Sequence, residues 1–230
     1  MQTRRLRAVL FDVDFTLSRP GPELGPEAYR RVGDTHGLSL DPERYEAARI
    51  AAFADLRIHP ELEHDEEIWI AFTEDIVRGM GGDGDACRSV AEAITDRWLH
   101  SENFELYDDV LPVLGLLRDH GLKLGLVSNT SRDLDEFVRH FRLDVDAWIS
   151  SRTHGKVKPS PTIFKAILEE LEVEPPAAVM VGDSAEDDVE GARALGMDAY
   201  LVDRGGGAGP DALPTLLALP ALLGIGADAA

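Results

Sequence analysis

Hydrophobic and polar positions along this chain follow two different patterns. Residues 7–13 (RAVLFDV) form a short apolar run closed by acidic residues, which is typical of a buried strand. From residue 26 to about residue 100 the apolar positions recur at helical spacing instead, as they do at Ile68, Phe72 and Ile76. The pattern therefore predicts a first strand followed by a helical region.

Helix boundary signals divide this helical region into four segments. A first helix is predicted from about Pro26 to His36, with Gly37 placed to end it. Asp41, followed by a proline, predicts the start of a second helix. Asp65 and Asp83 predict the N-caps of two more. We expect four helices here and no strand.

From residue 105 onward, helices and strands alternate. This alternation predicts a parallel sheet with helices on both faces, so the expected fold class is α/β, with a Rossmann-like core and a small all-α, four-helix domain. After it, the glycine-rich residues 205–209 predict a linker and residues 211–223 a short helix on the core. The expected elements are helix 109–119, strand 123–128, helix 132–141, strand 147–150, helix 161–171, strand 177–182, helix 186–195 and strand 198–202.

The two patterns define two domains. The helical region interrupts the α/β pattern, so we assign residues 1–17 and 102–230 to the core and residues 18–101 to an inserted helical domain. Residues 18–25 are rich in proline and glycine and predict a linker at the first junction.

The chain is strongly acidic. It has 23 Lys and Arg residues against 43 Asp and Glu residues among its 230, which gives a formal net charge of −20. Such a surface repels nucleic acid and anionic lipid, so we expect neither as a partner. A phosphorylated substrate would be repelled too, so a phosphate site would need local cations or a metal ion.

Cysteine usage and the N-terminal residues bear on location. Cys87 is the only cysteine, so no intrachain disulfide can form, which fits a reducing cytoplasm. The first apolar run is broken by Asp12 and Asp14, so we expect neither a signal peptide nor a membrane span there. The prediction is a cytoplasmic protein.

Polar side chains follow several of the predicted strands. In open parallel sheets, ligands bind beyond the carboxyl ends of the strands. Four separate segments of this chain deliver polar groups to that edge. The candidates are Asp12 and Asp14 after the first strand, Ser128 and Asn129 after the second, Lys158 in the loop before helix 161–171, and Asp183 after strand 177–182.

These groups suit phosphoryl transfer. Carboxylate oxygens of Asp12 and Asp183, with the main chain at Asp14, would hold Mg²⁺, a cation that prefers oxygen ligands. Lys158, the Ser128 hydroxyl and Asn129 would neutralise and orient a phosphoryl group. One carboxylate can attack phosphorus, and a second carboxyl two residues further on can protonate the leaving oxygen and later activate water.

Four motifs, in order, resemble those of the haloacid dehalogenase-like superfamily. Its D-x-D-x-T motif is present here as AVLFDVDFTL, and its second motif, an apolar strand ending in Ser or Thr, as LGLVSNTS. Its lysine motif, K-P-x-P-x-x-F, is matched at KPSPTIF and selects Lys158 rather than Lys156. Its G-D-S-x-x-x-D motif is present as GDSAEDD, with Asp183 and Asp188 at the acidic positions.

The resemblance covers nearly the whole chain and implies roles for these residues. It implies a phospho-aspartate formed on Asp12, Asp14 as the acid and base, and a supporting role for Thr16 and Asp188. The helical insert resembles the family's cap, which closes over the site and selects the substrate. The family often has glycine after the second aspartate, whereas this chain has Phe15, which implies a changed entrance.

The function predicted is therefore Mg²⁺-dependent hydrolysis of a small phosphomonoester, with a phosphorylated metabolite as substrate. A haloacid dehalogenase of the same superfamily is an alternative, but the family's dehalogenases lack the second acid found here as Asp14. A phosphomutase could use the same residues. A catalytically idle binding module is the alternative from another class, and Phe15 alone hints at it.

Overall fold

The computed structural model describes residues 5–56 and 60–225 and divides the chain into two compact units. The first, here called the α/β unit, contains Met1–Arg19, Leu106–Thr130 and Leu134–Ala230. The second, here called the helical unit, contains Pro20–Glu105 and Ser131–Asp133. Each is described by itself below.

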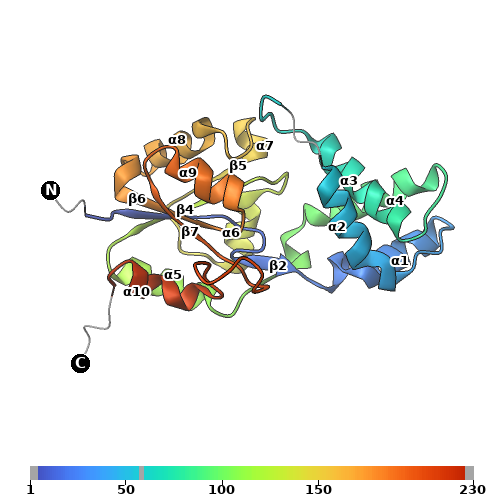
Figure 1. Ribbon diagram of the computed structural model, residues 1–230, viewed down its shortest axis with the longest axis horizontal. Helices are drawn as coiled ribbons and strands as arrows, with labels where there is room; N and C mark the ends of the chain where they lie inside the picture. The colour runs from blue at the N-terminus through green and yellow to red at the C-terminus, as the bar shows by residue number, and fades with distance from the viewer. Residues whose placement is uncertain (1–4, 57–59, 226–230) are drawn as a thin grey trace. The chain divides into compact units, whose positions relative to one another are not determined.

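The α/β unit is built on a parallel five-stranded sheet with the order β5-β4-β1-β6-β7 (Figure 1). β1 is central, and β4 and β6 flank it. The segments that follow these three strands therefore leave the sheet side by side at its carboxyl edge. The strands are β1 (Ala8–Phe11), β4 (Lys123–Ser128), β5 (Ala147–Ser150), β6 (Ala178–Gly182) and β7 (Asp198–Leu201).

Helices cover both faces of this sheet, because its strands are apolar on both sides. Val9 and Phe11 of β1 pack in one core with α5 (Val110–Asp119), α6 (Leu134–Phe141) and the C-terminal α10 (Leu219–Leu222). Ala8 and Leu10 alternate with them and pack in a second core with α8 (Pro161–Glu170) and α9 (Gly191–Arg193). Figure 1 shows α8 and α9 on one side of the strands and α5 and α10 on the other. The α/β prediction is confirmed.

Several predicted boundaries shift by a few residues. The helix predicted over 132–141 begins at Leu134, and the tail helix is short, as predicted. The helix predicted over 186–195 consists of a π-helical turn at Ala185–Glu190 followed by α9. One short helix, α7 (Ser151–His154), had no sequence signal that we recognised. It begins with a capping box in which Ser150 and Thr153 bond each other's backbone amides.

The described part of the helical unit contains four α-helices, as predicted: α1 (Pro26–Thr35), α2 (Tyr45–Asp55), α3 (Glu66–Gly79) and α4 (Ala86–Trp98). Their apolar faces form one core around Tyr29, Ile76 and Ile94. Asp65 caps α3, with its side chain accepting from the Glu67 amide, as predicted. The prediction for Asp83 is wrong, because α4 starts three residues later at Ala86.

Two short strands lie where the chain leaves and re-enters the α/β unit. β2 (Ser18–Pro20) pairs with β3 (Phe104–Leu106). On one side of this pair the Tyr107 amide donates to the Leu17 carbonyl, and on the other the Gly21 amide donates to the Asn103 carbonyl. The first junction, predicted as a linker, is therefore ordered by pairing with residues that are distant in sequence. Single-sequence patterns do not report such long-range pairing.

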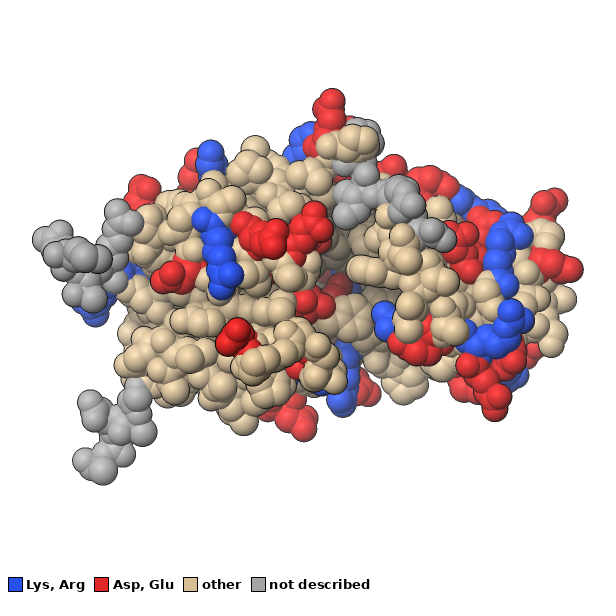
Figure 2. Space-filling view, viewed as in Figure 1, with Lys and Arg blue, Asp and Glu red and all other residues tan. Residues whose placement is uncertain are grey.

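Acidic side chains are spread over both units, with Lys and Arg side chains between them, as Figure 2 shows. Several of the cations form ion pairs within one helix, such as Arg30 with Glu27 and Asp34 on α1. Among the described residues, no helix has both the length and the hydropathy needed to cross a membrane.

Candidate active site

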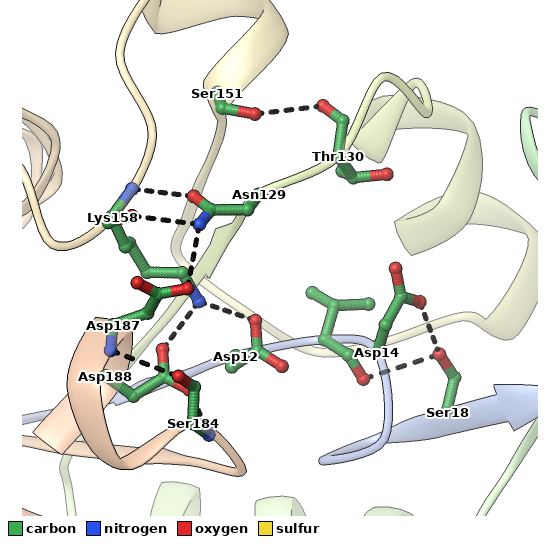
Figure 3. Close-up of polar contacts among 11 residues, drawn as sticks. Asp12, Asp14, Ser18, Asn129, Thr130, Ser151, Lys158, Ser184, Asp187 and Asp188 are labelled. Atoms are coloured by element: carbon green, nitrogen blue, oxygen red, sulfur yellow. Dashed lines mark hydrogen bonds and ion pairs between the residues drawn. The ribbon is translucent and has the colours of Figure 1, made fainter. Parts of the chain in front are cut away.

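The loop after β1 carries the first two candidate carboxylates. Asp12 continues the sheet, because its amide donates to the Val181 carbonyl of β6 at 2.9 Å, and its side chain is buried. The chain then turns back: the amides of Leu17 and Ser18 both donate to the Val13 carbonyl. The Ser18 hydroxyl donates to Asp14 Oδ1 at 3.3 Å (Figure 3). The loop therefore holds both carboxylates at the end of the central strand.

Phe15 lies in this turn with a φ of 63°, in the left-handed region that favours glycine. Its amide donates to the Ser18 carbonyl at 2.6 Å, so the conformation is part of the turn. This geometry gives a physical reason for the glycine that the family resemblance implies at this position. Phe15 is 41% exposed, so it lies at the surface of the loop.

Lys158 joins two of the acidic segments. Its ammonium donates to Asp12 Oδ1 and to Asp188 Oδ1, both at 2.6 Å. Figure 3 shows the lysine side chain reaching to both carboxylates from the loop before α8. The side chain is 2% exposed, so both ion pairs are shielded from water. An ammonium has three donors, so one N–H remains for a further acceptor.

Asn129 positions this lysine through the backbone. The Asn129 side-chain oxygen accepts from the Lys158 amide at 2.7 Å, and its nitrogen donates to the Lys158 carbonyl at 3.1 Å (Figure 3). The same nitrogen also donates to Asp187 Oδ2 at 3.5 Å. The side-chain amide of Asn129 therefore fixes the loop that carries Lys158. Asn129 was predicted as a phosphate ligand, and that prediction did not include these contacts.

Asp183 and Asp188 lie on the segment after β6. One carboxylate oxygen each from Asp12, Asp183 and Asp188 fall within 4.8 Å of one another. Asp188 Oδ1 accepts from Lys158, and Asp188 Oδ2 accepts from the Ser184 amide at 3.0 Å. Since both of its oxygens have protein donors, Asp188 is suited to support Lys158 rather than to bind a cation. Asp12 and Asp183 are the better suited pair for a metal ion.

Crowded carboxylates shift the acid–base properties of this cluster. Burial, reinforced by repulsion from Asp188 and Asp183 and opposed by Lys158, raises the pKa of Asp12 well above its usual range. Asp183 keeps solvent exposure, yet the protein atoms packed around its carboxyl and repulsion from Asp188 raise its pKa to about 7. Burial alone would lower the pKa of Lys158, but the carboxylates of Asp12 and Asp188 raise it overall.

This donor set fits a divalent cation. The clustered carboxylates carry more negative charge than Lys158 alone can balance, and this repulsion adds to burial, the larger cause, in raising the pKa values of Asp12 and Asp183. The ligands are oxygens, as Mg²⁺ prefers.

The remaining sequence candidates lie nearby in the fold. Ser128 ends β4, the strand next to β1, and is buried. Thr16 is fully buried in the loop after Asp14, and among the described residues its hydroxyl has no hydrogen-bond partner. Ser18 and Ser184, which bond Asp14 and cap the segment of Asp188, were not predicted. Ser184 had a usable signal, since a serine before an acidic stretch is typical of an N-cap.

Comparisons with known proteins agree with this arrangement. The haloacid dehalogenase-like hydrolase family matches residues 6–196. The human haloacid dehalogenase-like hydrolase domain-containing protein 3 is 31% identical over 218 residues, which cover 91% of this chain and 84% of that protein. Glyceraldehyde 3-phosphate phosphatase of Methanopyrus kandleri is 32% identical over 212 residues, which cover 87% of this chain and 85% of that enzyme.

Solved structures show the same fold. A haloacid dehalogenase-type phosphatase from Thermococcus onnurineus has a TM-score of 0.66 and 28% identity, covering 95% of this chain and 98% of that one. A 2-haloacid dehalogenase from Pseudomonas syringae has a TM-score of 0.63 and 25% identity, covering 96% of this chain and 99% of that one. With the four motifs in order and the acidic residues gathered around Lys158, the chain belongs to the haloacid dehalogenase-like hydrolase family.

Proposed function

We propose that this protein hydrolyses a small phosphomonoester through a phospho-aspartate on Asp12. The observation that carries the proposal is the pairing of a buried aspartate with a second carboxylate, Asp14, in one hydrogen-bonded loop. Curated relatives support the reaction type, since the Methanopyrus kandleri relative is named a phosphatase. So does the Halopiger xanaduensis relative, a ribulose-1,5-bisphosphate 5-phosphatase that is 29% identical over 205 residues.

The two aspartates have different tasks. The free oxygen of Asp12 attacks phosphorus while its Oδ1 is held by Lys158, and the substrate's alcohol leaves with a proton from Asp14. Asp14 then removes a proton from water, which cleaves the acyl phosphate and regenerates Asp12. Asp14 suits this exchange because it is only half-buried.

Lys158 and Ser128 bind the phosphoryl oxygens in this proposal. Lys158 has one ammonium proton beyond its two carboxylate partners, and its buried position makes that charge effective. Asn129 maintains the position of the lysine through its backbone, and Asp188 maintains the position of the ammonium.

Asp12, Asp183 and the main-chain carbonyl of Asp14 would hold Mg²⁺. When bound, the ion neutralises negative charge on the carboxylates and on the phosphoryl group.

A second candidate function is dehalogenation, because one similar structure is a 2-haloacid dehalogenase. Asp14 argues against it, since an ester substrate needs an acid for its leaving alcohol and a halide ion does not. A phosphomutase would use the same aspartates. It differs from a phosphatase in its product, which is a rearranged phosphate ester and not free phosphate. An idle binding module would show no turnover at all.

We further propose that residues 18–101 act as a lid that selects the substrate, with hinges at residues 18–24 and about 101–104. Support comes from the chain order, since this segment enters directly after the Asp12–Ser18 loop, and from the pairing of β2 with β3 at the two junctions. Exchanging this segment for another family member's should change substrate preference and leave the metal requirement intact. Unchanged preference would contradict the lid.

The proposal also places the protein in the cytoplasm, acting on a small phosphorylated metabolite. Its single cysteine, Cys87, is buried in the helical unit and fits a reducing compartment. Fractionation of the native host with antibody detection tests the location.

A turnover assay tests the proposed function. We expect release of phosphate from members of a panel of phosphorylated metabolites and from p-nitrophenyl phosphate, in the presence of Mg²⁺ and not of EDTA. Ca²⁺ should inhibit, because its looser coordination can occupy both Asp12 oxygens. Asp12→Asn is the blank. No phosphate release by the wild-type protein across the panel, or full activity in EDTA, would contradict the proposal.

A further inference from the structure

Arg204, which follows β7, contacts three residues in two segments that are distant from it in sequence. Its Nη2 donates to the Thr16 carbonyl at 2.6 Å, its Nη1 forms an ion pair with Asp109 Oδ2 at 2.8 Å, and its guanidinium lies 3.8 Å from the centre of the Tyr107 ring. The Arg204 side chain is only 14% exposed. None of the four family motifs includes this arginine.

Asp109 fixes the guanidinium. Its Oδ2 also accepts from the Leu216 amide at 2.8 Å and from the Thr215 hydroxyl, and the carboxylate is 7% exposed. Burial opposes ionisation, yet the hydrogen bonds from Arg204, Thr215 and Leu216 hold the pKa of Asp109 below its usual range. The pair therefore stays charged at neutral pH, and Arg204 has little freedom to move.

Arg204 and its neighbour Tyr107 hold two consecutive carbonyls of the loop that follows Asp14. Arg204 binds the Thr16 carbonyl, and the Tyr107 amide binds the Leu17 carbonyl at 3.0 Å. Within the loop, the Leu17 amide donates to the Val13 carbonyl, and the Leu17 side chain packs in the core of the α/β unit. Since Thr16 is two residues from Asp14, the guanidinium fixes the backbone from which the Asp14 carboxylate extends.

We propose that Arg204 is a positioning residue for the reaction: it holds the Thr16 carbonyl and thereby sets the placement of Asp14. The inference rests on the proposed function for its kinetic consequence, whereas its consequence for the loop does not depend on any activity. A displacement near 1 Å in a reacting group can lower the rate on the order of 100-fold. Arg204 does not touch the phosphoryl site in this scheme, so its loss should lower kcat without raising KM.

The test compares Arg204→Met and Arg204→Lys with Arg193→Met. Arg193 is a matched control, because it also donates to a backbone carbonyl, that of Ala199 at 2.9 Å, on the far side of the sheet from Asp109. Hydrogen exchange at the amides of residues 12–18 and the kcat for p-nitrophenyl phosphate with Mg²⁺ are measured for each. Because Arg204→Met removes a charged hydrogen bond, amide exchange in that loop should become faster by about tenfold or more.

We expect Arg204→Met to show faster exchange and lower kcat, Arg204→Lys to recover part of both, and Arg193→Met to match the wild type. Unchanged exchange in Arg204→Met, or the same loss in Arg193→Met, overturns the inference. An inactive wild-type protein would sink the proposed function, and the exchange result would still decide the role of Arg204. Should Arg204→Met fail to fold, Arg204→Lys carries the same comparison, since lysine cannot make all three contacts.

Discussion

Individual side chains in this site have opposing effects on the ionisation of their neighbours, and the balance of these effects decides which groups are charged. Lys158 lies 2.6 Å from two carboxylates and favours the charged form of Asp12, the proposed nucleophile, whereas burial disfavours that form. Removing the Lys158 ammonium would leave two buried carboxylates without their cation, which costs roughly 3–5 kcal/mol of folding free energy. Stability and reactivity therefore depend on the same ion pairs.

Phe15 gives a prediction at this scale. At an ordinary position alanine is more stable than glycine by roughly 0.5–1 kcal/mol. With a φ of 63° at position 15, that order should reverse, because the left-handed conformation costs an L-residue about 1–2 kcal/mol. Urea denaturation of Phe15→Gly and Phe15→Ala measures the difference, and both variants lack the ring. Greater stability for Phe15→Ala would show that the turn is not strained.

A close contact between the end of β6 and Asp188 positions part of the site in the α/β unit. Gly182 ends β6 beside Asp188, and a Cβ built at Gly182 would lie 2.1 Å from Asp188 Oδ2. That oxygen accepts from the Ser184 amide, and the other oxygen supports Lys158. Glycine at position 182 therefore leaves the space that the Asp188 carboxylate of the following π-helical turn occupies.

Gly182→Ala tests this fit, with Gly115→Ala as its control. The first should destabilise the protein by about 1–3 kcal/mol, as overpacking does, and should lower activity by displacing Asp188 from Lys158. A Cβ at Gly115, inside α5, meets nothing within 4 Å, so that change should stabilise by up to about 1 kcal/mol. Equal thermal unfolding midpoints for the two variants would contradict the described packing.

The sequence predicted these elements well where local signals were strong. The apolar runs gave the buried strands, and Asp65 gave the start of α3, because both patterns reflect local geometry. The pairing of β2 with β3 and the bond from Arg204 to Thr16 were not predictable, because they join residues far apart in sequence. Asn129 was predicted to bind phosphate, and only the structure shows its hydrogen bonds to the Lys158 backbone.

The whole molecule carries a net charge of −20, and its site concentrates part of that charge. A carboxyl whose pKa is higher in the folded state stabilises the fold at low pH, and this contribution is lost as the pH rises through the folded pKa. For Asp183 that window runs from its ordinary value of 3.8 to about 7. Water screens part of the effect, because Asp183 is exposed to solvent.

A bound cation should reverse this loss. We expect Mg²⁺ to raise the unfolding temperature more at pH 8 than at pH 6, because at the lower pH a proton on Asp183 competes with the metal. Each displaced proton should weaken apparent binding by roughly tenfold per pH unit below that pKa. Asp183→Asn is the control and should abolish most of the Mg²⁺ effect at both pH values. A shift that is equal at pH 6 and pH 8 would exclude Asp183 as the competing group.

The most direct test of the account follows the phosphoryl group in Asp14→Asn. p-Nitrophenolate leaves without needing a proton, so the first step should continue, whereas the second step lacks its base and should slow by about 100-fold or more. The account predicts a burst of about one nitrophenolate per enzyme and a mass increase of one phosphate on the peptide that contains Asp12. Turnover at the wild-type rate, or phosphate on Ser128 instead, would contradict it.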